Sequence, residues 1–330
     1  MTRPTPCLVV ERSALDHNIA TIGETLPGDR LRPHVKAFKS TALARKLADA
    51  GHQNFTCATV REVEGMAAAG LGHDLLLANE VLDPALLTRL AAVDGNVTLA
   101  VDSEETVSRA AAAGVKQVLI DVEVGLPRCG VVPEDAGRLA DTARAAGLDV
   151  RGVMGYEGHL MMVHDRAERV AKVEAAMTLL LQAAEAVGGD IVSAGGTGTY
   201  DVNTWANEIQ AGSFIVGDSQ YGTLDLPFAQ ALFVECEIIS KSDRGWLVAN
   251  AGLKALGMDH GDPTWPDGEV FFCSDEHITL TCADLDAVDL GQRIRLIPAH
   301  VDPTIAKHES MWLVDGDEVI EELPIDLRHW

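Results

Sequence analysis

The stretch HDLLLANEVLDPALLTRLAAVDGNVTLAV, residues 73–101, contains one complete repeat of the pattern that decides the fold. An apolar run at 73–78 predicts a buried strand. A helical pattern then begins at Asp83 and Pro84, because aspartate caps a helix and proline suits its first turn. The pattern ends on a glycine, as helix ends prefer, before a second apolar run at 96–101. The order of strand, helix and strand is typical of a parallel βα unit.

Apolar runs of this kind alternate with alanine-rich amphipathic segments up to about residue 225. There are eight such runs, at 30–36, 54–58, 73–78, 96–101, 116–122, 149–155, 190–194 and 211–216. Eight parallel strands alternating with helices over about 200 residues predict a (β/α)8 TIM barrel. A doubly wound open sheet is the alternative, because periodicity cannot show whether a sheet closes.

The pattern changes after residue 226, where long helical segments give way to short strand-like runs such as FVECEIIS, EVFFCS, HITLTC and MWLV. These runs predict a mainly antiparallel β domain. We therefore expect an α/β chain with a barrel at 12–225 and a β domain at 226–330. The strand CLVV at 7–10 predicts that residues 1–11 join the β domain.

Composition excludes several classes of partner. The formal charge of −24 argues against nucleic acid and anionic membranes, since both require a basic surface. Six cysteines without a CxxC pair predict reduced thiols and a cytoplasmic location. There is no run of 18 apolar residues, so we expect a soluble protein. The acidity itself is not a clue to the substrate.

A reactive lysine is predicted at the end of the first strand, in RPHVKAFK at 32–39. On an extended strand His34 and Lys36 share a face, so Lys36 would point into the barrel mouth with Lys39 nearby. Burial and a neighbouring cation both lower the pKa of a lysine, which favours Schiff-base formation. The alternative is a pair of surface lysines in a loop.

A phosphate site is predicted where the seventh and eighth strands end. The seventh predicted strand ends in SAGGTGTY at 193–200, and the eighth begins with AGSF at 211–214. Glycine lets backbone N–H groups approach a phosphate, and these two loops are the usual phosphate site of a TIM barrel. A lysine and a phosphate cradle together suggest pyridoxal 5′-phosphate as the cofactor.

Two further strand ends carry polar side chains. GYEGH supplies Tyr156, Glu157 and His159, and DVEVGLPRCGV supplies Asp121 and Arg128. An arginine suits the phenolate oxygen of the cofactor, and a tyrosine or histidine suits its ring nitrogen or a substrate proton. A structural role is equally open for each of these residues.

The β domain contains a candidate metal pair in IPAHVDPT, where His300 and Asp302 stand two apart. On extended backbone both side chains would face one side, as two ligands of one metal must. An imidazole with a carboxylate suits Mn²⁺ or Mg²⁺, with Zn²⁺ as the alternative ion. An ordinary polar turn is the competing interpretation.

The motifs RPHVKAFK, GYEGH, SAGGTGTY, AGSF, SDEH and PAHVDPT occur in the order seen in fold-type III pyridoxal-phosphate enzymes. The chain most resembles the D-threonine aldolase and D-serine dehydratase family, which has an alanine racemase-like amino-terminal barrel and a metal-binding carboxy-terminal domain. Carried over, Lys36 is the Schiff-base lysine, and Arg128 and Tyr156 contact the cofactor ring. The family usually continues RPHxKTHK, whereas this chain has Ala37 and Phe38 at those two positions.

The resemblance also implies the remaining site residues. The phosphate positions are Gly196, Thr197, Gly212 and Ser213, and the metal pair is His300 with Asp302. The aldolases have His with Asp, whereas the eukaryotic D-serine dehydratases have His with Cys, so Asp302 favours the aldolase side. The resemblance further implies a homodimer.

The implied activity is a lyase of D-amino acid metabolism that cleaves a D-3-hydroxy amino acid, such as D-threonine, to glycine and an aldehyde. His159 is the candidate base for the 3-hydroxyl proton. A D-serine or 3-hydroxy-D-amino-acid dehydratase is the alternative for the same residues. An amino-acid racemase and a non-catalytic pyridoxal-phosphate carrier are further alternatives.

Overall fold

The computed structural model describes residues 3–330, and its contacts divide the chain into two compact units. The βα unit comprises Ile22–Lys36, Ala44–Gly212 and His329–Trp330. The β unit comprises the residues up to Thr21, Ala37–Leu43 and Ser213–Arg328. Each unit therefore draws on segments that are far apart in the sequence.

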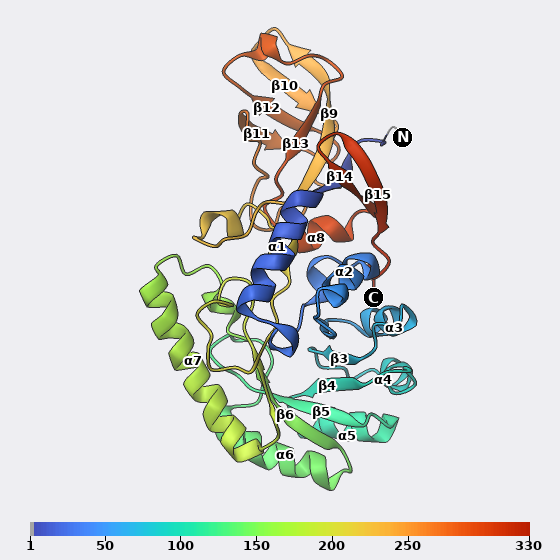
Figure 1. The fold of residues 1–330 in the computed structure, drawn as a ribbon, viewed down its shortest axis with the longest axis vertical. Helices are drawn as coiled ribbons and strands as arrows, with labels where there is room; N and C mark the ends of the chain where they lie inside the picture. Colours follow the sequence, from blue (N-terminus) through green and yellow to red (C-terminus); the bar gives the residue numbers. More distant parts are fainter. Residues whose placement is uncertain (1–2) are drawn as a thin grey trace. The chain divides into compact units, whose positions relative to one another are not determined.

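The βα unit contains a seven-stranded parallel sheet whose strands lie in chain order. Figure 1 shows helices alongside the strands of this sheet. The strands are β2 (Asn54–Cys57), β3 (Asp74–Leu77), β4 (Val97–Val101), β5 (Gln117–Asp121), β6 (Asp149–Gly155), β7 (Ile191–Ala194) and β8 (Glu208–Ile209). The helices between them are α3 (Val60–Ala68), α4 (Pro84–Ala91), α5 (Glu104–Ala113), α6 (Ala136–Ala145) and α7 (Arg166–Val187).

Helix starts in this unit follow local chemistry. The Asp83 carboxylate accepts hydrogen bonds from two backbone N–H groups of the first turn of α4, and Pro84 occupies its first position. Ser103 caps α5 in a capping box with Thr106. These contacts satisfy N–H groups that have no partner inside the helix. The alternation predicted from the sequence is confirmed for the six strands from β2 to β7.

The first and eighth predicted strands, and the closed barrel that they imply, are wrong. Residues 30–36 form two isolated parallel bridges, Leu31 with Ile209 and His34 with Thr56. Pro33 has no N–H to add to a ladder, and a 3₁₀ turn begins at Val35. The predicted run at 211–216 contains a 3₁₀ turn at Ser213–Ile215, and the strand β8 lies before it. The described residues of the βα unit thus form an α/β half-barrel of seven strands.

One face of the parallel sheet is arranged in layers. Side chains from four successive strands form an apolar cluster of Leu76, Ala100, Leu119 and Met154. Asp74 and Thr98, two residues earlier on β3 and β4, point to the same face because strand side chains alternate. This apolar layer therefore separates a polar layer at the strand starts from the loops at the strand ends.

The β unit contains an eight-stranded sheet in the order β11-β12-β10-β9-β1-β14-β15, with β13 also paired to β9. Every pairing is antiparallel except that of β1 with β14, so the predicted mainly antiparallel architecture is confirmed. The strands are β1 (Cys7–Glu11), β9 (Leu232–Ser242), β10 (Trp246–Ala249), β11 (Glu269–Cys273), β12 (Ile278–Thr281), β13 (Arg293–Leu296), β14 (Ser310–Asp315) and β15 (Glu318–Pro324).

The remaining helices are α1 (Arg12–Thr25), α2 (Thr41–Asp49) and α8 (Val301–Ala306), which follows β13 in the β unit. In the part of the chain that the structure describes, no helix combines the length and the apolar character needed to cross a membrane.

Candidate functional site

The segment that carries Lys36 is fixed on both sides by backbone hydrogen bonds. The N–H of Arg32 donates to Ile209 at 2.9 Å, and the N–H of His34 donates to Ala211 at 3.1 Å. On the other side, the N–H of Thr56 donates to the carbonyl of Pro33 at 3.0 Å. The chain then enters the 3₁₀ turn Val35–Ala37, in which Lys36 is half-buried.

The predicted strand geometry of Lys36 is therefore wrong, because a 3₁₀ turn does not place alternate side chains on one face. A short turn directly after a fixed segment still gives Lys36 a defined backbone position. Phe38 and Ala37, which replace the family's histidine and threonine, are buried, so Phe38 contributes to the core of its unit.

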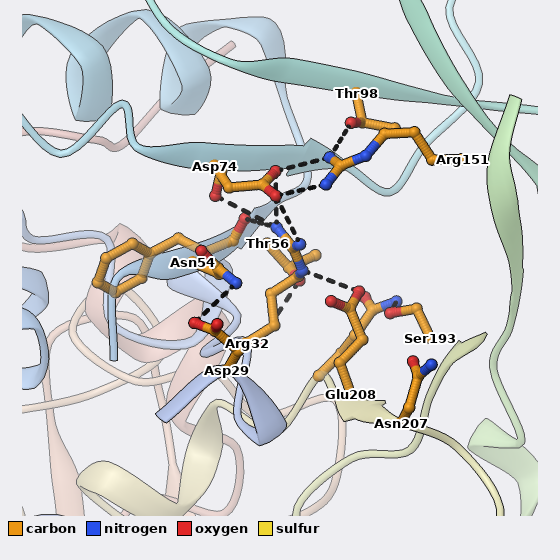
Figure 2. Close-up of polar contacts among 12 residues, drawn as sticks. Asp29, Arg32, Asn54, Thr56, Asp74, Thr98, Arg151, Ser193, Asn207 and Glu208 are labelled. Carbon is orange, nitrogen blue, oxygen red and sulfur yellow. Dashed lines mark hydrogen bonds and ion pairs between the residues drawn. The ribbon is translucent and has the colours of Figure 1, made fainter. Parts of the chain in front are cut away.

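Arg32 anchors the start of this segment in a buried polar network, shown in Figure 2. Its guanidinium donates to Glu208 at 2.8 Å and pairs with Asp74 at 3.3 Å. Arg151 donates to both oxygens of Asp74, at 2.9 and 2.7 Å, and to the hydroxyl of Thr98 at 2.7 Å. These contacts link the polar side chains at the strand starts. They hold Arg32 in place, four residues before Lys36.

Glu157 organises the glycine-rich loop that follows β7. Its carboxylate is fully buried and accepts hydrogen bonds from the backbone N–H of Gly195 at 3.0 Å and the hydroxyl of Thr199 at 2.9 Å. It also accepts one from the side-chain amide of Asn203 at 2.9 Å. The sequence identified Glu157 only as one polar group among several, since its partners lie about forty residues further along the chain.

The glycines of this loop are required by close packing. Gly195 has φ +78°, which disfavours other residues. A Cβ at Gly196 would lie 2.7 Å from the sulfur of Met161, and one at Gly198 would lie 2.0 Å from the Met161 carbonyl. Thr197, between them, is buried. The predicted phosphate positions Gly196 and Thr197 thus lie in a tightly held loop at a strand end.

The predicted ring contacts Arg128 and Tyr156 come together. The guanidinium carbon of Arg128 lies 5.3 Å from the centre of the Tyr156 ring, within the range of a cation–π contact. Tyr156 directly follows β6. His159 is exposed, and its ring packs against Gly125, where a Cβ would lie 2.9 Å from Cε1. The loop of Arg128 and the loop of His159 therefore contact each other.

A cluster of acidic groups lies beside Arg128. Burial, reinforced by the carboxylate of Glu80, raises the pKa of Asp121 well above its usual range, although Arg128 opposes this. Burial and Glu80 also raise the pKa of the Cys129 thiol to about 12. Ligand atoms of Glu80, Asp102 and Cys129 lie within 4.8 Å of one another. Burial and the Glu80 carboxylate thus favour the protonated form of Asp121, and the raised pKa disfavours the thiolate form of Cys129.

The predicted metal pair lies at the amino-terminal end of α8. His300 is the residue before the helix, with φ −142°, and Asp302 is in its first turn. The expectation that both stand on extended backbone is therefore wrong, because the helix begins between them. The imidazole Nδ1 of His300 lies 2.7 Å from Oδ2 of Asp259, and the ring stacks on His260 at 3.9 Å.

Three ligand atoms gather here, from Asp259, His260 and His300, within 4.8 Å of one another. The sequence did not single out Asp259 or His260, which stand about forty residues before His300. The pattern MDHGDP offered no spacing typical of a metal site.

Asp218 supports the same helix end from a buried position. Its carboxylate accepts hydrogen bonds from the backbone N–H of Tyr221 at 3.0 Å and of Val301 at 3.1 Å. Burial raises the pKa of Asp218. Gly212 directly precedes the 3₁₀ turn that begins at Ser213, whose carbonyl accepts from the N–H of Gly217 at 2.8 Å. The last two predicted phosphate positions therefore lie at the start of a turn.

The predicted site residues carry side chains that suit both pyridoxal phosphate and a divalent metal ion. Lys36 carries a primary amine, and the held glycine loop contains Thr197, whose hydroxyl and backbone N–H are the kinds of group that a phosphate takes. His300 offers an imidazole and Asp302 a carboxylate, which are ligands of divalent ions.

Comparison with known proteins identifies the family. Residues 10–220 match the family described as alanine racemase, N-terminal domain, and residues 231–314 match a putative serine dehydratase domain. The chain is 32% identical to a 3-hydroxy-D-aspartate aldolase of Paracoccus denitrificans (strain Pd 1222), covering 98% of this chain and 92% of that protein. It is 31% identical to a D-threonine aldolase of Arthrobacter sp, covering 97% and 91%.

Among solved structures, the D-threonine aldolase from Filomicrobium marinum has a TM-score of 0.93 and 31% identity, covering 98% of this chain and 96% of that chain. The chain therefore belongs to the fold-type III pyridoxal-phosphate enzymes of the D-threonine aldolase and D-serine dehydratase family, and it is a pyridoxal-phosphate-dependent lyase.

Proposed function

We propose that this enzyme is a divalent-metal-dependent aldolase that cleaves D-3-hydroxy amino acids to glycine and an aldehyde. The observation that carries the proposal is the His300–Val301–Asp302 sequence at the start of α8, in a chain about a third identical to aldolases over nearly its whole length. A histidine with a carboxylate is a donor set for Mn²⁺ or Mg²⁺, with Zn²⁺ as the alternative.

Lys36, we propose, is the residue whose amine would hold pyridoxal phosphate covalently. The bound cofactor supplies an electron sink for the carbanion that bond cleavage leaves at Cα. Gly196, Thr197, Gly212 and Ser213 bind its phosphate, and Arg128 and Tyr156 contact its ring. The Arg128–Tyr156 contact supports a shared role, since one residue orients the other.

His300 and Asp302 are the proposed ligands of the metal, which supplies a Lewis acid that lowers the pKa of a coordinated hydroxyl. His159 is the proposed base that takes the proton from the 3-hydroxyl. Its exposed imidazole, packed on Gly125, is open to solvent for release of that proton.

A product assay tests the proposal directly. The enzyme loaded with pyridoxal phosphate and Mn²⁺ is incubated with D-threonine, with 3-hydroxy-D-aspartate and with D-serine. Retro-aldol cleavage gives glycine with acetaldehyde from the first and glycine with glyoxylate from the second. Racemisation that is independent of metal would contradict the proposal.

The second candidate is a dehydratase, which the match of residues 231–314 to a putative serine dehydratase domain favours. In that reaction Lys36 would take the Cα proton and the 3-hydroxyl would leave as water. The resulting enamine would then hydrolyse to a keto acid and ammonia. Pyruvate and ammonia from D-serine, without glycine from D-threonine, would select it.

The domain organisation and assembly are part of the proposal. We propose a pyridoxal-phosphate domain at 12–225 and a metal-binding domain at 226–330 with 1–11. We also propose a cytoplasmic homodimer. Size-exclusion chromatography with light scattering measures the assembly state.

A further inference from the structure

We propose that Asp259 is a positioning residue for His300, which it holds in the tautomer and ring orientation that leave Nε2 available to a divalent metal ion. The inference rests on the proposed metal-dependent function and adds a residue to it. Asp259 lies in the segment after β10, outside the PAHVDPT motif that contains His300.

The backbone of His300 is already fixed by the helix start. Its carbonyl accepts a hydrogen bond from the hydroxyl of Thr304 at 2.7 Å. The next N–H in the chain, from Val301, donates to the buried carboxylate of Asp218 at 3.1 Å. These contacts do not determine how the imidazole is rotated about its side-chain bonds. They also do not determine which ring nitrogen carries the proton.

Asp259 determines both. Its Oδ2 lies 2.7 Å from Nδ1 of His300, the distance of a charge-assisted hydrogen bond. An aspartate carboxylate accepts hydrogen bonds, so Nδ1 carries the proton and donates it. A neutral imidazole has one N–H and one lone pair, which leaves the lone pair on Nε2. Metal-binding histidines commonly have their other nitrogen held by a carboxylate in this way.

His260 also restricts the orientation of the His300 imidazole. Its ring lies parallel to that of His300 within 7°, with the centres 3.9 Å apart. Stacking fixes the plane of the ring, and the hydrogen bond to Asp259 fixes its rotation within that plane. The side chain of His300 is 24% exposed, so Nε2 is not sealed in the core. The arrangement is a half-buried imidazole with one nitrogen used and the other free to bind.

Metal affinity tests this role without relying on turnover. The enzyme is stripped with a chelator, kept loaded with pyridoxal phosphate, and titrated with Mn²⁺ while free Mn²⁺ is followed by electron paramagnetic resonance. Loss of an outer partner of a metal ligand typically costs about 10- to 100-fold in affinity, so Asp259→Ala should raise the Kd for Mn²⁺ by that factor. Asp267→Asn, which removes one exposed acidic charge from the same unit, is the matched control and should leave the Kd unchanged.

Asp259→Asn separates positioning from direct coordination. Its side-chain carbonyl can still accept from Nδ1–H, so its Kd should lie between those of the wild type and Asp259→Ala. A Kd as weak as that of Asp259→Ala would overturn the positioning role in favour of direct coordination by the carboxylate. A wild-type Kd in Asp259→Ala would overturn any role.

The tautomer provides a second readout in the metal-free protein. A ¹⁵N–¹H correlation spectrum of the histidine rings, with the His300 signal assigned by its loss in His300→Gln, should show the Nδ1–H form in the wild type. Asp259→Ala should shift the signal toward the Nε2–H form, which predominates in free imidazole side chains. An Nε2–H wild type would overturn the inference.

One further variant separates this inference from the proposed function. If His300→Gln binds Mn²⁺ as the wild type does, the metal role of His300 itself fails, and the inference fails with it. If His300→Gln loses Mn²⁺ and Asp259→Ala does not, only the role of Asp259 fails.

Discussion

Replacement of Asp74 by alanine should destabilise the βα unit more than any surface change of equal charge. Asp74 is 7% exposed and is shared by two guanidinium groups, Arg151 at 2.7 Å and Arg32 at 3.3 Å. Removal of one member of a buried ion pair costs about 3–5 kcal/mol, because the remaining charge stays desolvated. Arg32 retains Glu208 and Arg151 retains Thr98, so we expect the lower end, about 3 kcal/mol.

The assay is thermal unfolding of the wild type and the variant at pH 7. A loss of 1 kcal/mol lowers the melting temperature by about 2–4 °C for a unit of 150–250 residues, so Asp74→Ala should lower it by about 6–12 °C. Glu64→Gln is the matched control, since Glu64 pairs with Arg89 at the surface, where solvent screens the interaction. A shift no larger than that of the control would refute the reasoning.

The same residue predicts a pH dependence. Burial acts to raise the pKa of Asp74, but the hydrogen bond from Arg151 and the charge of Arg32 outweigh it and hold the pKa below 3.8. A carboxyl with a depressed folded pKa contributes stability that is present above its unfolded value of 3.8 and is lost as the pH falls through the folded value. The free energy of unfolding of the wild type should therefore exceed that of Asp74→Asn at neutral pH, and this difference should shrink below about pH 4.

Three further changes test the site. Lys36→Ala should abolish the visible absorbance of bound pyridoxal phosphate, measured in a scan before and after cofactor addition; retention of that band would exclude Lys36 as the covalent attachment. Glu157→Gln should weaken cofactor binding about tenfold, measured by reconstitution of the apoenzyme, because the amide lacks the charge that holds the N–H of Gly195. Unchanged affinity would show that this loop does not contribute to phosphate binding. Burial and Glu80 raise the pKa of Cys129 to about 12, so it should react with iodoacetamide at pH 8 far more slowly than an ordinary thiol, and Glu80→Gln should speed the reaction. Rapid wild-type labelling, identified by mass spectrometry, would contradict the raised pKa.

The sequence predicted those parts of the fold that depend on neighbours along the chain. Apolar runs and helix caps such as Ser103 act over a few residues, so β2 to β7 and the strands of the β unit appear near their predicted positions. Residues 30–36 were predicted as the first strand of the βα alternation, although Pro33 stands in the middle of this segment. Pro33 has no N–H to pair, and pairing also depends on register with distant strands, which the local sequence does not show.

The candidate site divides in the same way. Lys36, the glycine loop and His300 stand in recognisable motifs, whereas the contacts that hold them join residues far apart in the sequence. Glu157 acts on a backbone N–H 38 residues away, and Asp259 acts on an imidazole 41 residues away. Such supporting contacts are set by tertiary structure, and a carboxylate has the same local sequence signal whether it supports a ligand or faces water.

The central position of β1 in the sheet of the β unit has a consequence for biosynthesis. β1 pairs through Leu8 with Val234 of β9 and with Met311 of β14. As a ribosome synthesises the chain, β1 emerges before every other strand of its sheet, and it gains its second neighbour only when residues 310–315 have been made. The strand must remain unpaired on that side while the residues between β1 and β14 are made, at roughly 5–20 residues per second. Nascent chains of this protein therefore expose β1 as a strand with a missing partner for tens of seconds. A chaperone that binds extended apolar segments has a defined target in CLVV.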